Sequence, residues 1–221
     1  MQFFPDITPD GHDADPEDVD QPRRPDWTGP PADWWPTAVG TSVLLASSDH
    51  VAVGLTAMAV YPTGVALSLR WMLRSRGQGR RDWADLMDRF EGGRFRGQAD
   101  PARGIRFGLV LADGTPVLSH AEYELPAELD VPAGAGPGDD TGLGEPAAPT
   151  GPLLVLAEQG GSGDDRSYAT SATLWLWPLP PEGPREIVMT WPEFGIGETR
   201  HALPAVDVVT AAEQARSAWD D

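Results

Sequence analysis

The sequence contains no cysteine, no lysine and no asparagine among its 221 residues. Without cysteine the chain cannot form a disulfide, a thiolate zinc site, an iron–sulfur cluster or a Cys nucleophile. All 16 basic residues are Arg and only four residues are Ile, a composition typical of a high-GC genome. The use of Arg in place of Lys therefore carries no functional information by itself.

Long apolar runs are missing as well. The longest weakly polar run, Val51–Tyr61, has 11 residues, whereas a helix that spans a membrane needs about 20. The first residues, Met1 to Asp6, lack the basic and apolar regions of a secretory signal. We therefore expect a soluble, cytoplasmic protein that is not associated with a membrane.

Acidic residues outnumber basic ones by 34 to 16, which gives a formal net charge of -18. This charge repels phosphate backbones at long range, so general nucleic-acid binding is not expected. No metal or cofactor is predicted either. Asp139-Asp140 and Asp164-Asp165 lack the ligand spacing of an EF-hand loop. The Gly-rich run 160–165 fits neither a nucleophile elbow nor a phosphate-binding loop.

Residues 1–35 are predicted to form a disordered, acidic, Pro-rich tail. The stretch 1–33 holds nine acids, two Arg and seven Pro, but few large aliphatic side chains. Such a segment buries too little apolar area to offset the entropy lost on ordering. The exceptions are Trp27, Trp34 and Trp35, which would dock the end of the tail onto the folded body.

Residues 36–219 are predicted to form a single domain. Its clearest element is a hairpin around the turn Pro62-Thr63-Gly64. The first arm, Val51–Tyr61, is apolar on both faces, as in a central strand, and the second, Val65–Leu73, alternates with one polar face. Further strands are expected over 42–46, 105–111, 115–125, 153–157, 167–177, 186–191 and 198–203. Amphipathic helices are expected over 80–90 and 206–219, and residues 131–151 read as a flexible Pro/Gly/Ala insertion.

The order of these elements predicts the fold class. Strands do not alternate regularly with helices, which argues against a parallel, doubly wound sheet. We therefore predict a mainly β protein, a two-layer antiparallel β-sandwich with one short inserted helix and a C-terminal helix that covers an edge or a face.

Histidines are the candidates for acid–base chemistry. His12 lies in the predicted tail, and His201 belongs to the last predicted strand. The residue types of a hydrolase triad occur at Asp49, His50, Ser119 and His120. A triad is defined by geometry, however, and not by sequence position. A hydrolase would need one of these His residues and a carboxylate to converge in a pocket.

Arginine and tryptophan supply the candidates for partner binding. The segment Arg70–Arg106 carries ten Arg and five acids in an otherwise acidic chain. Arg70, Arg74 and Arg76 would form an edge for an acidic protein, unless the segment is a solvated face paired with the chain's own acidic tail. Trp175 and Trp177 share one side of a strand, and Trp191 is expected on a neighbouring strand, which gives either a stacking platform or ordinary core packing.

A series of motifs runs through the domain: VAVxLT (51–56), YPTG (61–64), ADG (112–114), WPLPPxGP (177–184), WPxxGIxETR (191–200) and AW (218–219). This series resembles a family of uncharacterised proteins of high-GC Gram-positive bacteria over residues 36–219. The resemblance implies a single soluble domain and assigns no catalytic or ligand-binding residue.

The sequence leaves three hypotheses open. The first is a non-enzymatic β-sandwich that binds another protein or itself through Trp175, Trp177, Trp191, Arg70, Arg74 or Arg76. The second is a hydrolase-type enzyme that uses His50 or His120 with a carboxylate. The third is a carbohydrate-binding module, suggested by the nine Trp of the chain.

Overall fold

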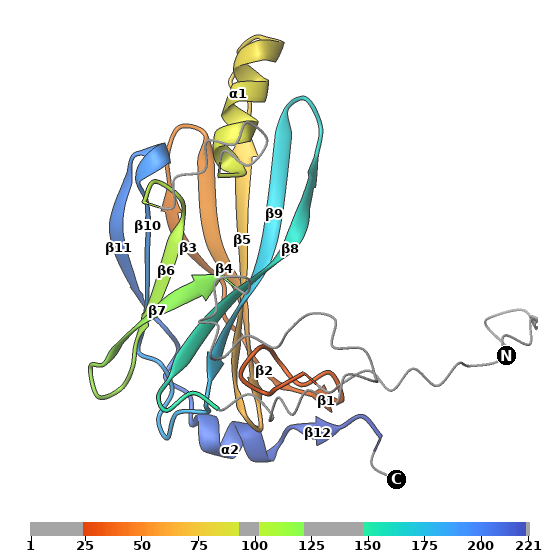
Figure 1. The fold of residues 1–221 in the computed structure, drawn as a ribbon, viewed down its shortest axis with the longest axis vertical. Coiled ribbons are helices and arrows are strands. Elements are labelled where there is room, and N and C mark those ends of the chain that lie inside the picture. Colours follow the sequence, from red (N-terminus) through yellow and green to blue (C-terminus); the bar gives the residue numbers. More distant parts are fainter. Residues whose placement is uncertain (1–23, 93–101, 122–147, 220–221) are drawn as a thin grey trace, which may run out of the picture.

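The computed structural model describes residues 24–92, 102–121 and 148–219, and Figure 1 shows a mainly β protein with two α-helices in this part of the chain. Most of its strands belong to one sheet that curls into a sandwich-like body, and a two-stranded sheet lies beside it. The predicted fold class is confirmed.

The first layer of the sandwich is antiparallel and is centred on the predicted hairpin. Its strands are β2 (Thr37–Val39), β3 (Val43–Ser47), β4 (Val51–Tyr61), β5 (Gly64–Arg74), β8 (Leu153–Gly163) and β9 (Ser167–Trp177). Strand β4 pairs with β5, and β5 pairs with β9, over nearly their full lengths. The short strands β2 and β3 share the other edge of β4.

The second layer consists of β6 (Arg106–Val110), β10 (Glu186–Trp191) and β11 (Ile196–Ala202). A 3-10 turn, η3 (Pro192–Phe194), connects the last two strands. The inner sides of both layers meet in one apolar core, in which the rings of Trp71 on β5 and Phe107 on β6 lie 6.0 Å apart. Period-two patterning produces this core, because Leu69, Trp71 and Leu73 are buried while the alternate residues Arg70, Met72 and Arg74 are exposed.

Strand β7 (Pro116–Ala121) joins the two layers along one side. It pairs antiparallel with β6 through Gly108 and Leu118, and parallel with β8 through Ser119 and Leu154. On the other side, β3 and β11 lie close together, and His201 Nε2 donates a hydrogen bond of 2.6 Å to the Leu45 carbonyl oxygen. The two layers are thus joined by β7 on one side and by the His201 hydrogen bond on the opposite side.

A second, smaller core lies on the outer side of the first layer. Leu153, Val155 and Trp175 point outward there, and Trp27 covers them with only 9 % of its surface exposed. The Trp175 indole N–H donates a hydrogen bond of 3.0 Å to the Asp26 carbonyl oxygen. Trp27 therefore docks the end of the predicted tail onto the body, as the sequence indicated, while residues 1–23 lie outside the described residues.

Helix α1 (Arg80–Phe90) has the predicted bounds and buries Trp83, Leu86 and Phe90. The C-terminal helix is shorter than predicted, because α2 spans only Val208–Glu213. Strand β12 (Arg216–Ser217) follows and pairs with β1 (Trp34–Trp35), so backbone pairing replaces the last predicted turns of the helix.

Two further predictions need correction or fall outside the structure. The strand predicted over 153–157 is longer in the structure, because β8 runs to Gly163 and pairs with β9 beyond a bulge between Glu158 and Gly161. The turn that follows includes Asp164, whose carboxylate accepts hydrogen bonds from the backbone N–H groups of Arg166 and Ser167. Of the predicted insertion 131–151, residues 131–147 lie outside the described part.

Candidate functional site

The histidines proposed for catalysis lie in different parts of the sheet. His50 immediately precedes β4, whose first residue pairs with Leu73 on β5. His120 on β7 pairs with Val155 on β8. The cross-strand pairs that start at Val155 run through β9 and β5 and end at Ala59 on β4, so Ala59 marks the level of His120 in the sheet. Ala59 lies eight residues along β4 from Val51, which corresponds to about 26 Å at 3.3 Å per residue. His50 and His120 therefore cannot act on one substrate atom.

The polar neighbours of His50 have other partners. Its Nδ1 lies 3.3 Å from the Arg74 carbonyl oxygen, and the Asp49 carboxylate forms a 2.9 Å ion pair with Arg76. Ser119, adjacent to His120, is half-buried on the inner side of β7. Within the described ranges, no three His, Asp or Glu side chains gather as a metal site would require.

The three tryptophans proposed as a platform are not brought together. Trp175 and Trp177 do share the outer side of β9, as predicted, but Trp175 is 1 % exposed beneath Trp27. Trp191 lies in the interior of the sandwich, where its ring packs 5.4 Å from Phe90 and 4.7 Å from Phe194. The predicted neighbourhood was wrong, because β6, β7 and β8 separate β10 from β9.

The proposed arginines lie near one end of β5. Arg70 is exposed on the outer side of the strand, between Gly54 on β4 and Ser171 on β9. Arg74 Nε donates a 2.9 Å hydrogen bond to the Asp49 carbonyl oxygen, and Arg76 pairs with the carboxylate of that residue. Arg70 and Arg74 thus share the outer side of β5, and Arg76 pairs with Asp49 in the turn before β4.

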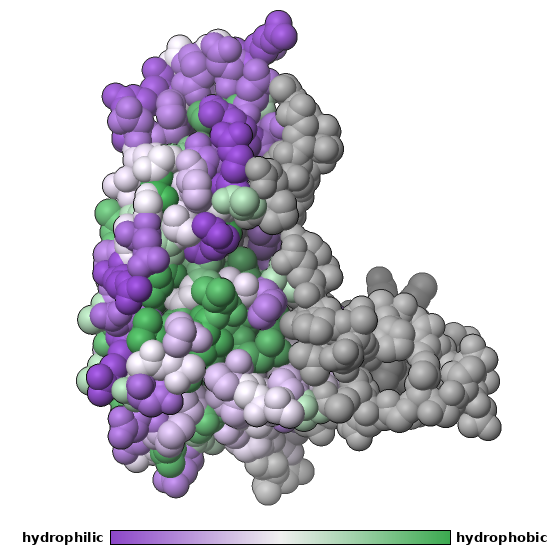
Figure 2. Space-filling model, turned by 60° about the vertical axis from the view of Figure 1, so that its left-hand side comes forward, coloured by the Kyte–Doolittle hydropathy of each residue, from purple (hydrophilic) through white to green (hydrophobic). Residues whose placement is uncertain are grey.

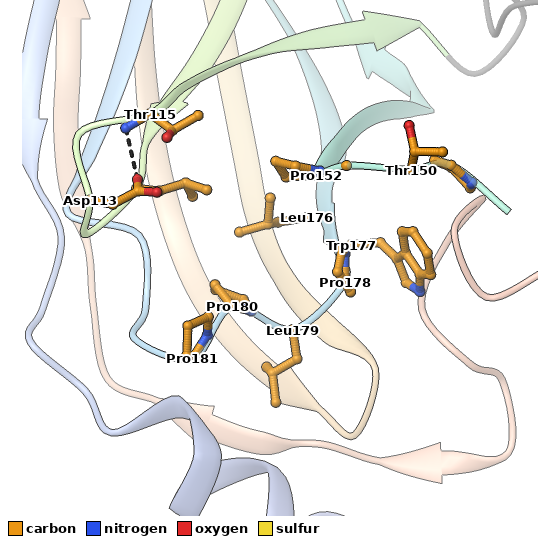
Figure 3. Close-up of a pocket in the computed structure, with 13 residues that line it drawn as sticks. Asp113, Thr115, Thr150, Pro152, Leu176, Trp177, Pro178, Leu179, Pro180 and Pro181 are labelled. Atoms are coloured by element: carbon orange, nitrogen blue, oxygen red, sulfur yellow. Dashed lines mark hydrogen bonds between the residues drawn. The ribbon is translucent and has the colours of Figure 1, made fainter.

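A shallow pocket of about 390 Å³ opens at the other end of the sandwich (Figure 3). The turn between β6 and β7 forms one wall, and the segment that follows β9 forms the opposite one. Proline dominates the lining, which includes Pro149, Pro152, Pro178, Pro180 and Pro181. The proline-rich segment after β9 therefore forms a wall of this pocket, a role that could not be inferred from the sequence.

Asp113 is the charged side chain in the described lining of this pocket. Its carboxylate accepts a 2.8 Å hydrogen bond from the Thr115 backbone N–H, and this bond lowers the pKa of Asp113. The remaining lining offers Leu111, Leu176 and Leu179 together with the Thr115 and Thr150 hydroxyls. The pocket can hold an apolar group beside the Asp113 carboxylate, but its described lining residues provide no acid–base pair for catalysis.

Two indoles that the sequence did not single out for binding are the most exposed aromatic side chains described. Trp35 on β1 is 70 % exposed, and Trp219, just after β12, is 82 % exposed. The sequence predicted a helix over 206–219, but the chain leaves the helix after Glu213 and pairs with β1, so Trp219 lies outside any helix. Figure 2 shows a further apolar area in the middle of one face, bordered by hydrophilic side chains.

Helices long and apolar enough to cross a bilayer are absent from the described ranges. The resemblance noted in the sequence stays a prediction, because the chain matches no family model, no curated protein and no solved structure.

Proposed function

We propose that this protein acts by binding another protein and that the two-stranded β1–β12 sheet is its docking element. The observation that carries the proposal is the exposure of Trp35 on this small sheet and of Trp219 two residues after it, at 70 % and 82 %. Tryptophan is highly buried on average in folded proteins, so two such exposed rings at one small element favour a covering partner.

The chemistry of indoles supports this choice. Tryptophan is enriched among the residues that contribute most to protein–protein affinity, because a large rigid ring buries much apolar area at little entropic cost. Among the described residues no further strand pairs with the outer edges of the small sheet, and such edges can accept an extended segment of a partner. Arg216, opposite Trp35 in the β1–β12 register, adds a cation at the same place.

The described pocket lining contains Asp113 but neither His50 nor His120, which favours this proposal over a hydrolase that pairs one of these histidines with a carboxylate. The burial of Trp175 and Trp191 likewise removes the platform on which a carbohydrate-binding module would depend. The cytoplasmic location and the lack of general nucleic-acid binding stay predictions of the sequence.

The test replaces both indoles with serine, Trp35→Ser and Trp219→Ser, in the full chain. The matched control is Leu118→Ser, which removes a side chain that is 72 % exposed on β7, away from the small sheet. Circular dichroism should show unchanged folding, since exposed side chains contribute little to stability.

Quantitative pull-down from the native cell should then show a partner that binds the native chain and the Leu118→Ser control equally. We expect at least a tenfold loss with the double indole variant, about 1.4 kcal/mol of binding free energy. Light scattering distinguishes a second copy from a different protein. Equal capture by all three chains would contradict the proposal.

A further inference from the structure

The outer side of the first layer is covered over only half of its length. Near the β4–β5 turn, Trp27 and its neighbours bury Ala66, Val155 and Trp175. Beyond Ser68, the same side of β4, β5 and β9 has no described covering segment. The residues of this bare half are Ala52, Gly54, Thr56, Ala57, Ser68, Arg70, Met72, Arg74, Ala169, Ser171 and Thr173.

The bare half has a distinct composition. Most of its residues are small, so the surface is flat, and none of the positions just named is acidic. Its long side chains are Arg70, Met72 and Arg74, and Met72 is 46 % exposed. Leu44, 61 % exposed, adjoins it through the pairing of β3 with Gly54. This surface therefore suits a segment that carries both acidic and apolar side chains.

Residues 1–23 are such a segment, and they directly precede the stretch that covers the other half. They contain seven acids and one Arg, together with Phe3, Phe4 and Ile7. By contrast, the described residues hold 17 acids and 13 Arg, so that most of the chain's excess negative charge lies elsewhere. Charge complementarity thus favours this segment as the occupant of the bare half.

The length of the segment permits the contact. Arg70 and Arg74 lie four and eight residues from Ala66 along β5, about 13 and 26 Å beyond the covered half. Asp20 and Asp13 lie seven and fourteen residues before Trp27 in the sequence. Stretches of these lengths span at most about 25 and 50 Å, so the acids between them can reach both arginines.

We propose that residues 1–23 dock onto the bare half of the first layer, with the acids between Asp13 and Asp20 opposite Arg70 and Arg74. The segment extends the cover that Trp27 begins, and Phe3 and Phe4 contact the exposed Leu44 and Met72. This inference does not depend on the β1–β12 proposal, since it concerns a different face and a different occupant.

Met72 is a built-in reporter of this contact, because oxidation of a methionine follows its exposure. The comparison uses the full chain, native or with Asp13, Asp15, Asp18 and Asp20 changed to Asn and Glu17 to Gln. We expect hydrogen peroxide to oxidise Met72 about threefold more slowly in the native chain. Met87, half-buried on α1, is the internal reference.

Arginine variants test the other side of the contact. Arg70→Gln with Arg74→Gln should remove the protection of Met72, whereas Arg80→Gln with Arg81→Gln on α1 makes the same charge change and should leave it intact. About 1 M salt should remove the protection in the native chain, since it shortens the screening length to about 3 Å. Equal Met72 oxidation in the native, acid-neutralised and Arg70/Arg74 chains would overturn the proposal.

A spin label identifies the occupant. Because the chain contains no cysteine, Val19→Cys gives a single labelling site that leaves every acid in place. We expect the label to broaden the amide signals of Gly54, Arg70 and Ser171 within the same molecule. Broadening that occurs only between mixed molecules would assign the face to a second copy and overturn the proposal, as would no broadening at these residues.

Discussion

At the scale of single residues, the nine tryptophans show what a sequence pattern can and cannot predict. Alternation correctly placed Trp175 and Trp177 on one side of their strand. It could not show that this side faces outward, or that Trp27 from a distant segment covers it. Burial of an outer strand face depends on a contact 148 residues away in the chain, between Trp175 and Trp27, and no local pattern encodes such a contact.

Trp27 was expected to dock the end of the tail onto the body, and its burial against Val155 and Trp175 makes it the residue at which this docking can be tested. We predict that Trp27→Ala lowers the free energy of unfolding by about 3 kcal/mol, because it empties the centre of the outer cluster. Urea denaturation provides the measurement. Trp35→Ala is the matched control and should cost less than about 0.5 kcal/mol, since that ring is exposed. Equal small effects would mean that residues 24–31 do not pack as described.

At the scale of elements, strong periodicity predicted the bounds well. The bounds of α1, β9 and β10 agree with those expected from the sequence, because each carries a clear pattern between turn residues. The misses occurred where partner strands decided the outcome. Strand β8 continues through Gly160 and Gly161 because β9 offers it a ladder, and α2 ends early because β12 pairs with β1.

The start of α2 depends on Asp207. Its carboxylate accepts hydrogen bonds from the backbone N–H groups of Val209 and Thr210, and these bonds lower the pKa of Asp207. Because the folded-state pKa lies below the unfolded value of about 3.9, this contribution to stability is complete above that value. It is lost as the pH falls through the folded-state pKa.

We accordingly predict that Asp207→Ala destabilises the protein at pH 7 and that the difference from the native chain shrinks toward pH 3. Urea midpoints measured across this range provide the test. Asp165→Ala removes another exposed carboxylate that caps no helix, and it should change the midpoint little at either pH. A constant Asp207→Ala difference from pH 7 to pH 3 would be inconsistent with a charged N-cap.

At the scale of the whole molecule, the fold class was predictable but the joining of the layers was not. Counting strands and helices suffices to predict a β-sandwich. The corner strand β7 pairs parallel with β8 across a segment of 31 residues, Glu122 to Pro152, and such distant pairings leave no mark in local periodicity. The candidate sites shared this limit, because the sequence could not place β9 and β10 in different layers.

The opposite side of the sandwich is held by His201 of β11, which bonds to the carbonyl oxygen of Leu45 on β3. We predict that His201→Ala lowers the free energy of unfolding by about 1 kcal/mol, because one hydrogen bond between the layers is lost. The rate of amide hydrogen exchange should increase most in β3 and β11, compared with the native chain. His120→Ala, at an exposed position on β7, should leave both measurements unchanged, and the same result for His201→Ala would exclude a role as a clasp.

The pairing of β1 with β12 leaves the first and last described stretches of the chain adjacent, with the Ala218 backbone N–H only 2.8 Å from the Asp33 carbonyl oxygen. A domain entered and left at neighbouring points can be inserted into a surface loop of a host protein without distorting the host or the domain. It can also be circularly permuted with a short linker. A fusion joined at Asp33 and Ala218 would therefore place its partner domains next to each other, and this body would add mass to the assembly but almost no length.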